Sequence, residues 1–184
     1  GEVFSFWKIL GKITKRKGYL NGRVIICGKM KARRGGGLCN LANTIHNLIL
    51  YSPLEVTEFH SHSDALASDI GHRVPFSSGT SVNYNYIDYR FKNNTDQDIQ
   101  LLLWCKNGKL YGELRSEREF PHRFELEEEG HHFRKEGDKY YRLSKIYKKT
   151  IDKSTNKVVN RELVLDNHSE VMFDINLIPE EMLV

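Results

Sequence analysis

Cysteine is scarce in this chain, which has only three among its 184 residues: Cys27, Cys39 and Cys105. An odd and small number of cysteines argues against a framework of disulfides. Cys27 and Cys105 each end a run of apolar residues, so both are predicted to be buried strand residues. Only Cys39 has the surroundings of a reactive thiol.

Long apolar runs are also missing. No run approaches the roughly 18 residues that a membrane helix needs, so no transmembrane segment is predicted. No signal peptide is visible either. The chain begins at Gly1 without a Met, so we expect that an upstream segment precedes it. A cytoplasmic or membrane-peripheral location is favoured.

Acidic residues are almost absent from residues 1–36, which contain ten Lys and Arg residues and one acid, Glu2. This segment carries a charge of +9, and the total of +4 leaves −5 for the rest of the chain. One interpretation is a basic rim that binds an anionic ligand, a phosphate or an acidic membrane surface. The candidate anion-binding residues are Lys31, Arg33, Arg34, Gly36 and Gly37. The other interpretation is a solvated basic face, neutralised by second-half acids such as Glu125, Glu127, Glu128 and Glu129. No nucleic-acid recognition module is present, so nucleic acid is not an expected partner.

The overall composition is that of a folded protein, with 39% hydrophobic and 28% charged residues. The length is typical of one domain, and we predict a single domain over residues 1–184. Residues 1–79 would form its α+β part, which bears the Cys and His candidates. Residues 80–184 would form an antiparallel, strand-rich part.

Apolar residues recur at helical spacing after three glycines, Gly35 to Gly37. They are Leu38, Leu41, Ala42, Ile45, Leu48 and Ile49. This stripe predicts a helix that ends before Ser52-Pro53. Cys39 would lie in its first turn, where unpaired backbone N–H groups and the helix dipole favour a thiolate.

The remaining pattern predicts an α+β fold with this helix packed on an antiparallel sheet. A short helix is expected from Val3 to Leu10, ended at Gly11. Strands are expected over 19–31 (a strand or a hairpin turning at Asn21-Gly22 or Gly28), 54–62, 81–91, 99–105, 109–114, 122–128, 140–150 and 158–165. Asn107-Gly108 is a strong hairpin signal, and residues 153–156 form a second turn.

The segment Glu58-Phe59-His60-Ser61-His62 is the second informative site. Side chains two apart on a strand share a face, so Glu58, His60 and His62 would line up. One hypothesis is that His60 or His62 deprotonates Cys39, with Glu58 or Asp88 orienting the base. Asp64 and Asp69 are rivals to Asp88 for that role.

Two other interpretations remain open. The histidines could bind a metal together with Cys39 or Glu58. Alternatively, the histidines are structural, and the glycines before Cys39 solve a tight packing problem. His46 is predicted to lie about 10 Å from Cys39 along the helix, too far for direct contact.

Four stretches of the sequence together resemble the VanW family. They are Gly1-Glu2-Val3-Phe4-Ser5-Phe6 with Gly11, Gly35-Gly36-Gly37-Leu38-Cys39, Glu58-Phe59-His60-Ser61-His62-Ser63, and residues 86–95. Residues 112–115 and 166–174 resemble the shorter, vancomycin-type members. The chain departs from the family at Asn40, where Gln is usual, and at Phe59, where Arg is frequent.

The resemblance implies a link to the bacterial cell envelope and to glycopeptide resistance, but it does not identify a reaction. From the residues we hypothesise a Cys-His thiol hydrolase or acyltransferase that acts on amides of peptidoglycan precursors. Backbone N–H groups after Gly37 would form its oxyanion hole. The alternatives are a non-enzymatic module that binds an anionic envelope ligand, or the metal site. No cofactor is expected, and the sequence does not indicate an oligomeric state.

Overall fold

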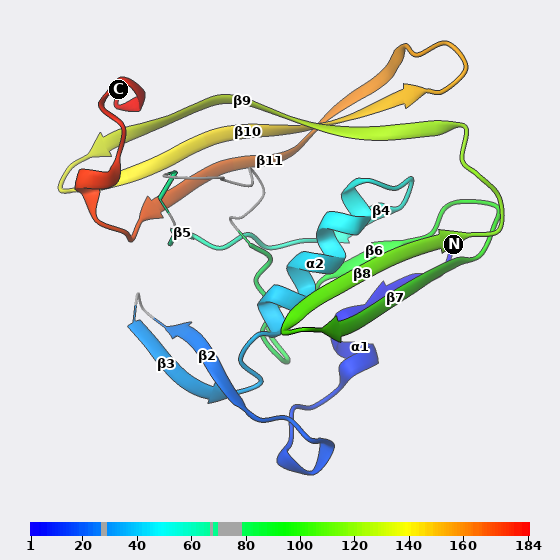
Figure 1. Ribbon diagram of the computed structural model, residues 1–184, viewed down its shortest axis with the longest axis horizontal. Coiled ribbons are helices and arrows are strands. Elements are labelled where there is room, and N and C mark those ends of the chain that lie inside the picture. Colours follow the sequence, from blue (N-terminus) through cyan, green and yellow to red (C-terminus); the bar gives the residue numbers. More distant parts are fainter. Residues whose placement is uncertain (27–28, 67, 70–78) are drawn as a thin grey trace. The chain divides into compact units, whose positions relative to one another are not determined.

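The computed structural model describes residues 1–26, 29–66, 68–69 and 79–184. They form a mixed, strand-rich structure with few helices, as an α+β fold has (Figure 1). Two compact units are present. Unit 1 comprises Gly1–His60 and Gly79–Pro121, and unit 2 comprises Ser61–Ser78 and His122–Val184. That the whole chain is one domain stays a prediction.

Unit 1 contains both α-helices and three small sheets. Strand β1 pairs with β6, which pairs with β4, and all neighbours are antiparallel. The hairpins β2–β3 and β7–β8 complete the unit. In chain order the elements are β1 (Val3–Ser5), α1 (Phe6–Leu10), the 3-10 helix η1 (Lys15–Lys17), β2 (Asn21–Ile26), β3 (Lys29–Arg34), α2 (Leu38–Leu50), β4 (Glu55–Glu58), β6 (Arg90–Lys92), β7 (Ile99–Lys106) and β8 (Lys109–Ser116).

Unit 2 is built on long antiparallel strands. Its sheet has the order β5-β11-β10-β9, in which the short strand β5 is parallel to β11. The elements are β5 (Asp64–Ala65), β9 (His122–Glu136), β10 (Lys139–Asp152), β11 (Val158–Val171) and the 3-10 helices η2 (Ile175–Leu177) and η3 (Glu180–Met182). The strands predicted here are confirmed, and each extends further than the sequence pattern indicates.

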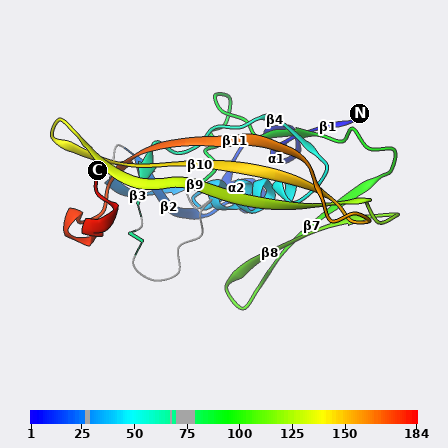
Figure 2. The same ribbon diagram turned by 90° about the horizontal axis from the view of Figure 1, so that it is seen from above.

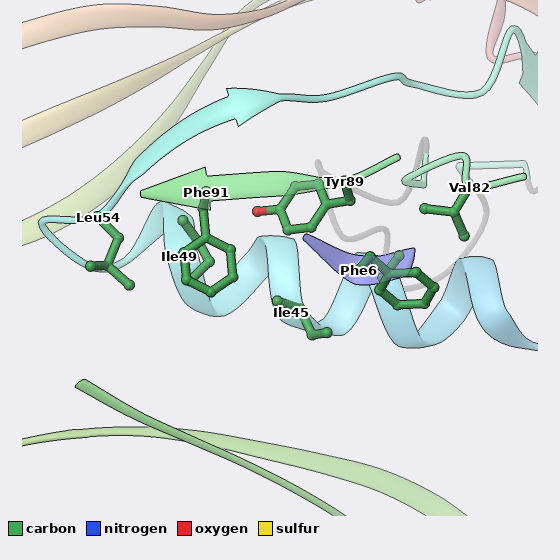
Figure 3. Packing of buried hydrophobic residues seen from close by; sticks show 8 residues of the cluster. Phe6, Ile45, Ile49, Leu54, Val82, Tyr89 and Phe91 are labelled. Carbon is green, nitrogen blue, oxygen red and sulfur yellow. The ribbon is translucent and has the colours of Figure 1, made fainter. Parts of the chain in front are cut away.

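Helix α2 confirms the predicted stripe. Its buried residues Ala42, Ile45 and Ile49 lie in the core of unit 1. Figure 3 shows this core, to which α1, β6 and the segments beside them also contribute. The other members are Phe6, Leu54, Val82, Tyr89 and Phe91. The helix ends as predicted, because the Ser52 hydroxyl and N–H both bond to the Ile49 carbonyl before Pro53.

The three glycines before α2 are explained by backbone geometry. A Cβ on Gly36 would lie 2.2 Å from the carbonyl carbon of Gly22, so these two backbones touch. Gly37 is the N-cap residue in the left-handed region, with φ of 92° and open space beside it. The turn therefore joins β3 directly to α2 through close backbone packing.

Several local expectations were wrong or only partly right. Residues 3–10 form β1 and then the short helix α1, rather than one helix. The first three of these residues pair with β6 as a strand, so the helix begins only at Phe6. The strand expected over 81–91 is restricted to β6, and a turn at Tyr84–Tyr86 precedes it. Cys105 is exposed rather than buried, since β7 continues past the part of the hairpin that contacts α2. Cys27 and the turn proposed at Gly28 lie outside the described residues.

Candidate functional site

Cys39 lies in the first turn of α2, as predicted. Its thiol donates a hydrogen bond to the Val82 carbonyl oxygen, with an S–O distance of 3.8 Å. The side chain is half-buried and packs against the apolar core of unit 1. No hydrogen bond or ion pair in the described part of the chain joins Cys39 to His60.

The first turn of α2 keeps backbone donors available. The Leu38 N–H bonds to the Gly35 carbonyl at 3.4 Å, and the Leu41 N–H bonds to the Gly37 carbonyl at 3.1 Å. The N–H groups of Cys39 and Asn40 have no backbone acceptor among the described residues. Two donors next to the thiol can therefore bond to an oxygen of a ligand.

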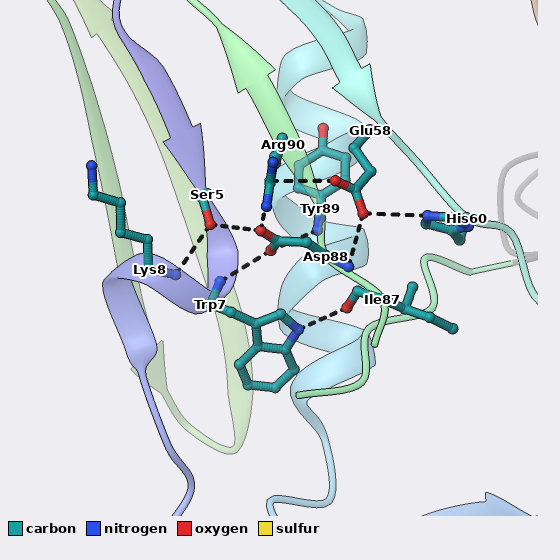
Figure 4. A network of polar contacts seen from close by, with 9 residues as sticks. All are labelled: Ser5, Trp7, Lys8, Glu58, His60, Ile87, Asp88, Tyr89 and Arg90. Carbon is teal, nitrogen blue, oxygen red and sulfur yellow. Dashed lines mark hydrogen bonds and ion pairs between the residues drawn. The ribbon is translucent and has the colours of Figure 1, made fainter. Parts of the chain in front are cut away.

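Glu58 and His60 are brought together, as the sequence predicts, but on the end of a strand. The β4–β6 pairing is irregular between Val56 and Glu58, so two β4 residues face one step of β6. Such a bulge re-aims the side chain that follows it. Glu58 then lies 3.4 Å from His60 (Oε1 to Nε2), and His60 is about half exposed. Figure 4 shows this pair at the edge of a larger polar network.

Asp88 is the centre of that network, and it does not contact His60 directly. The Ser5 hydroxyl donates to its carboxylate at 2.6 Å and Arg90 Nε at 2.8 Å. The backbone N–H groups of Trp7 and Tyr89 also donate to it, at 3.1 and 2.9 Å. Burial alone would raise the pKa of Asp88, but these four donors together hold the pKa below its ordinary value.

Asp88 and Glu58 are linked in two ways. The Asp88 backbone N–H donates to Glu58 Oε1 at 3.1 Å, and Arg90 Nε lies 3.3 Å from Glu58 Oε2. Of these two carboxylates, Glu58 is therefore the one that contacts His60, and it is itself bonded to the Asp88 backbone and paired with Arg90.

His62 belongs to unit 2, in the segment that leads into β5. Burial lowers the pKa of its imidazole, and nearby Asp64 opposes this shift without reversing it. A neutral imidazole at pH 7 is the form that accepts a proton. Of the rival acids, Asp64 accepts from Ser63, and Asp69 is paired with Arg142 and His131 inside unit 2.

The metal interpretation receives no support. Within the described ranges, no group of three or more His, Cys, Asp and Glu side chains is arranged to hold a metal ion. His46, which the sequence placed away from Cys39, is buried, bonds to the Tyr89 hydroxyl at 3.1 Å and stacks on Phe59. These contacts are those of a structural histidine.

The basic candidates lie exposed on β3. Lys31, Arg33 and Arg34 are all exposed, and no acidic side chain of the described residues forms an ion pair with them. The acids of the second half have partners inside unit 2: Glu125 pairs with Arg123, and Glu127 pairs with Lys149 and Arg161. Glu129 also pairs with Arg161.

Ser5, Trp7 and Arg90 were missed as members of the polar network. Their signal was available, because Ser5 and Arg90 lie within two of the sequence stretches that carry the family resemblance. The antiparallel pairing of β1 with β6 places Ser5 directly opposite Arg90. Two of the stretches that carry the family resemblance are thus brought into contact by the pairing of β1 with β6.

None of the helices in the described residues is long and apolar enough to cross a membrane. A family model described as "VanW like protein" matches residues 1–115. This match ends close to the end of unit 1 at Pro121.

Two curated proteins are similar to the chain. One is the vancomycin B-type resistance protein VanW of Enterococcus faecalis, 19% identical over 175 residues, which cover 95% of this chain and 64% of that protein. The other is the uncharacterized protein YoaR of Bacillus subtilis, 30% identical over 111 residues, or 60% of this chain and 33% of that protein. The chain spans less than two thirds of the length of either relative. No solved structure matches it.

Proposed function

The chain belongs to the VanW-like family, and from that premise we propose that it serves in glycopeptide resistance at the bacterial cell envelope, where its β2–β3 hairpin binds an anionic ligand. The name of the Enterococcus faecalis relative supports the link to vancomycin resistance. The relative is longer than this chain, so the proposal concerns the part that the two proteins share.

The observation that carries this proposal is a contrast in how the cations are paired. Arginines outside the basic segment have carboxylate partners, as Arg115 has Glu113, Arg118 has Asp96 and Arg134 has Glu136. Lys31, Arg33 and Arg34 are exposed with no acidic partner among the described residues. Because the acids expected to neutralise them already pair within unit 2, an external anion is the better partner.

The ligand class follows from the chemistry of this surface. Arginine presents planar, paired donors that fit phosphate and carboxylate oxygens. The turn through Gly36 and Gly37 leads from these cations to the two free N–H groups at the start of α2. A phosphate of a peptidoglycan precursor or of an anionic wall polymer fits such an arrangement.

Binding of poly(glycerol phosphate), measured by titration calorimetry, tests this proposal. The variant Lys31→Gln/Arg33→Gln/Arg34→Gln should bind at least about tenfold more weakly, and wild-type affinity should fall as salt rises from about 50 to 300 mM. Lys135→Gln/Lys145→Gln/Lys157→Gln removes three exposed charges of unit 2 and should change little. Equal binding by the two triple variants would refute the proposal.

We propose a second function, a thiol hydrolase or acyltransferase, because two features of unit 1 favour it. Cys39 has two free N–H donors beside it, and Glu58 orients His60. The imidazole of His60, which lies in the same unit as Cys39, would take the thiol proton as sulfur attacks the carbonyl carbon of an amide.

The reaction would then proceed through an acyl-enzyme. The N–H groups of Cys39 and Asn40 would bond to the oxyanion, and the imidazolium would return its proton to the leaving amine. Water would release the acyl group in a hydrolase, and an acceptor amine would do so in a transferase. Asn40 would contribute its backbone N–H here, which does not require the longer Gln side chain that is usual in the family.

Alkylation by iodoacetamide tests the second function. The background should be Cys27→Ser/Cys105→Ser, because Cys105 is exposed and would react by itself. At pH 6.5, His60→Ala should slow the labelling of Cys39 at least about tenfold. The control is His168→Ala, which removes an exposed histidine of unit 2. Labelling that His60→Ala does not slow would exclude the Cys-His mechanism.

A further inference from the structure

The β7–β8 hairpin has two different faces. Leu101, Leu103 and Leu114 pack against the core of unit 1. Because side chains alternate along a strand, Trp104 and Tyr111 lie on the opposite face. These two residues are directly paired across the hairpin and stack with ring centroids 5.7 Å apart.

Apolar side chains lie on both faces of the hairpin just before its turn. Trp104 is 42% exposed and Tyr111 is 39% exposed, so the stacked pair presents an apolar surface to its surroundings. The next pair towards the turn, Cys105 and Leu110, projects from the other face, and Cys105 is exposed. In Figure 2 the turn end lies apart from α2. No core of unit 1 accounts for this apolar surface.

Two lysines close the hairpin. Lys106 and Lys109 are directly opposite each other at the last pair before Asn107-Gly108. Like charges in this position destabilise a strand pair. The nearest acid on the hairpin, Glu113, is paired with Arg115, and no described carboxylate pairs with either lysine. Folding gains nothing from this charge pair, which points to an anionic partner.

We propose that the turn end of the β7–β8 hairpin binds the surface of an anionic lipid bilayer. Trp and Tyr concentrate at membrane interfaces, where the ring is buried and its polar edge stays hydrated. Lysines beside them contact lipid phosphates. By the alternation of side chains, Lys106 and Lys109 share one face of the hairpin with Trp104 and Tyr111. Rings and cations can therefore contact the same bilayer surface, which combines apolar chains with phosphates.

This surface is separate from the β2–β3 hairpin. It would hold unit 1 at the membrane while the basic residues of β3 remain free for a different anion. The two proposals therefore predict that different variants lose binding: β3 variants lose the anionic polymer, and variants of the β7–β8 hairpin lose the lipid vesicles.

Tryptophan fluorescence with lipid vesicles tests the proposal. Trp104 emission should shift to the blue with vesicles of phosphatidylglycerol and phosphatidylcholine, and not with phosphatidylcholine alone. Trp104→Phe should lose the shift, because Trp7 is held inside unit 1 by its bond to the Ile87 carbonyl. Lys106→Gln/Lys109→Gln should weaken vesicle binding about 30-fold, which is the effect of roughly fivefold for each lysine.

The control is Lys31→Gln/Arg33→Gln/Arg34→Gln, which should keep the shift. Each variant should melt like the wild type, since the changed residues are exposed. The proposal is overturned if anionic vesicles cause no shift, or if the β3 variant loses it while Lys106→Gln/Lys109→Gln keeps it. A shift that needs only higher protein concentration would indicate self-association, and binding of wall polymer without vesicle binding would indicate a glycan site. Either result would also overturn it.

Discussion

Asp88 is the residue on which the polar network of unit 1 depends, and this leads to a stability prediction. Its carboxylate accepts four hydrogen bonds from groups on α1, β1 and β6 or beside them. Asp88→Asn keeps the shape but loses the charge, so its unfolding free energy at pH 7 should fall by about 2 kcal/mol. Urea denaturation measures this difference.

The same residue sets a pH dependence. The pKa of Asp88 is lowered in the folded protein, whereas an unfolded Asp titrates near 3.9. The unfolded chain therefore binds the proton first as pH falls. The stabilisation is full above about pH 5 and is lost progressively as pH falls through about 4 and then through the lowered pKa of the folded protein. The difference in unfolding free energy between wild type and Asp88→Asn should therefore become smaller from pH 6 to pH 3. Asp98→Asn, at an exposed position, should show no such trend; a constant gap for Asp88→Asn would contradict the assigned role.

Residues of the candidate site were predictable where a local pattern places them. Glu58 and His60 are two apart, so an extended segment brings them to one side. Their link to Asp88 and Arg90 depends on the pairing of β4 with β6 and on a bulge, and no local pattern encodes either. Whether Cys39 reacts with these histidines stays a prediction.

At the scale of elements, the turn at Tyr84–Tyr86 shows how a sequence pattern misleads. Aromatic and polar residues alternate from Ser81 to Phe91 as in a half-buried strand. Asn85, however, takes φ of 66°, and the N–H groups of Tyr86 and Ile87 both bond to the Asn83 carbonyl. Tyr86 is consequently 84% exposed. Asn tolerates the left-handed region, and this preference outweighs the alternation.

Substitutions at Asn85 should reveal this turn. Asn85→Gly should leave the unfolding free energy unchanged or slightly higher, because glycine has no Cβ to strain. Asn85→Val should lower it by about 1–2 kcal/mol. Gln100→Val, on an exposed extended position of β7, controls for adding a β-branched side chain and should be neutral. If Asn85→Val is also neutral, the residue is in a strand after all.

The elements that were predicted well have strong local signals. Helix α2 has a six-residue apolar stripe and a Ser-Pro stop, and the β7–β8 hairpin has Asn107-Gly108. The lengths of β9 and β11 were underestimated because their missed residues, 129–136 and 166–171, are mostly polar or charged. Pairs between strands such as Lys139 with Glu170 contribute to these parts, and such pairs are visible only once register is known.

Charge is divided unevenly across the whole molecule. Unit 1 has 16 Lys and Arg against 9 Asp and Glu, a charge of +7, while unit 2 has 12 against 15, a charge of −3. The anion-binding and lipid-binding proposals both concern unit 1. This division accords with a family match that covers little beyond unit 1.

The chain crosses between its two units three times, so we expect them to unfold together. Residues 61–78 leave unit 1 and return to it, and this excursion is fixed to unit 2 where β5 pairs with β11. Both tryptophans, Trp7 and Trp104, lie in unit 1 and report on it alone. Ile146→Ala removes a fully buried side chain of unit 2 and should cost about 3 kcal/mol.

If the single-domain prediction holds, that substitution should lower the melting temperature by about 6–12 °C both in tryptophan fluorescence and in far-UV circular dichroism. Lys145→Ala, on an exposed position of the same strand, should shift neither signal appreciably. A fluorescence transition that stays in place while the dichroism transition moves would mean two separately folding units. The three crossings make the common shift the expected result. Unfolding of unit 2 would release the connection between His60 and Gly79, and unit 1 would then have to hold its two segments together across a free loop.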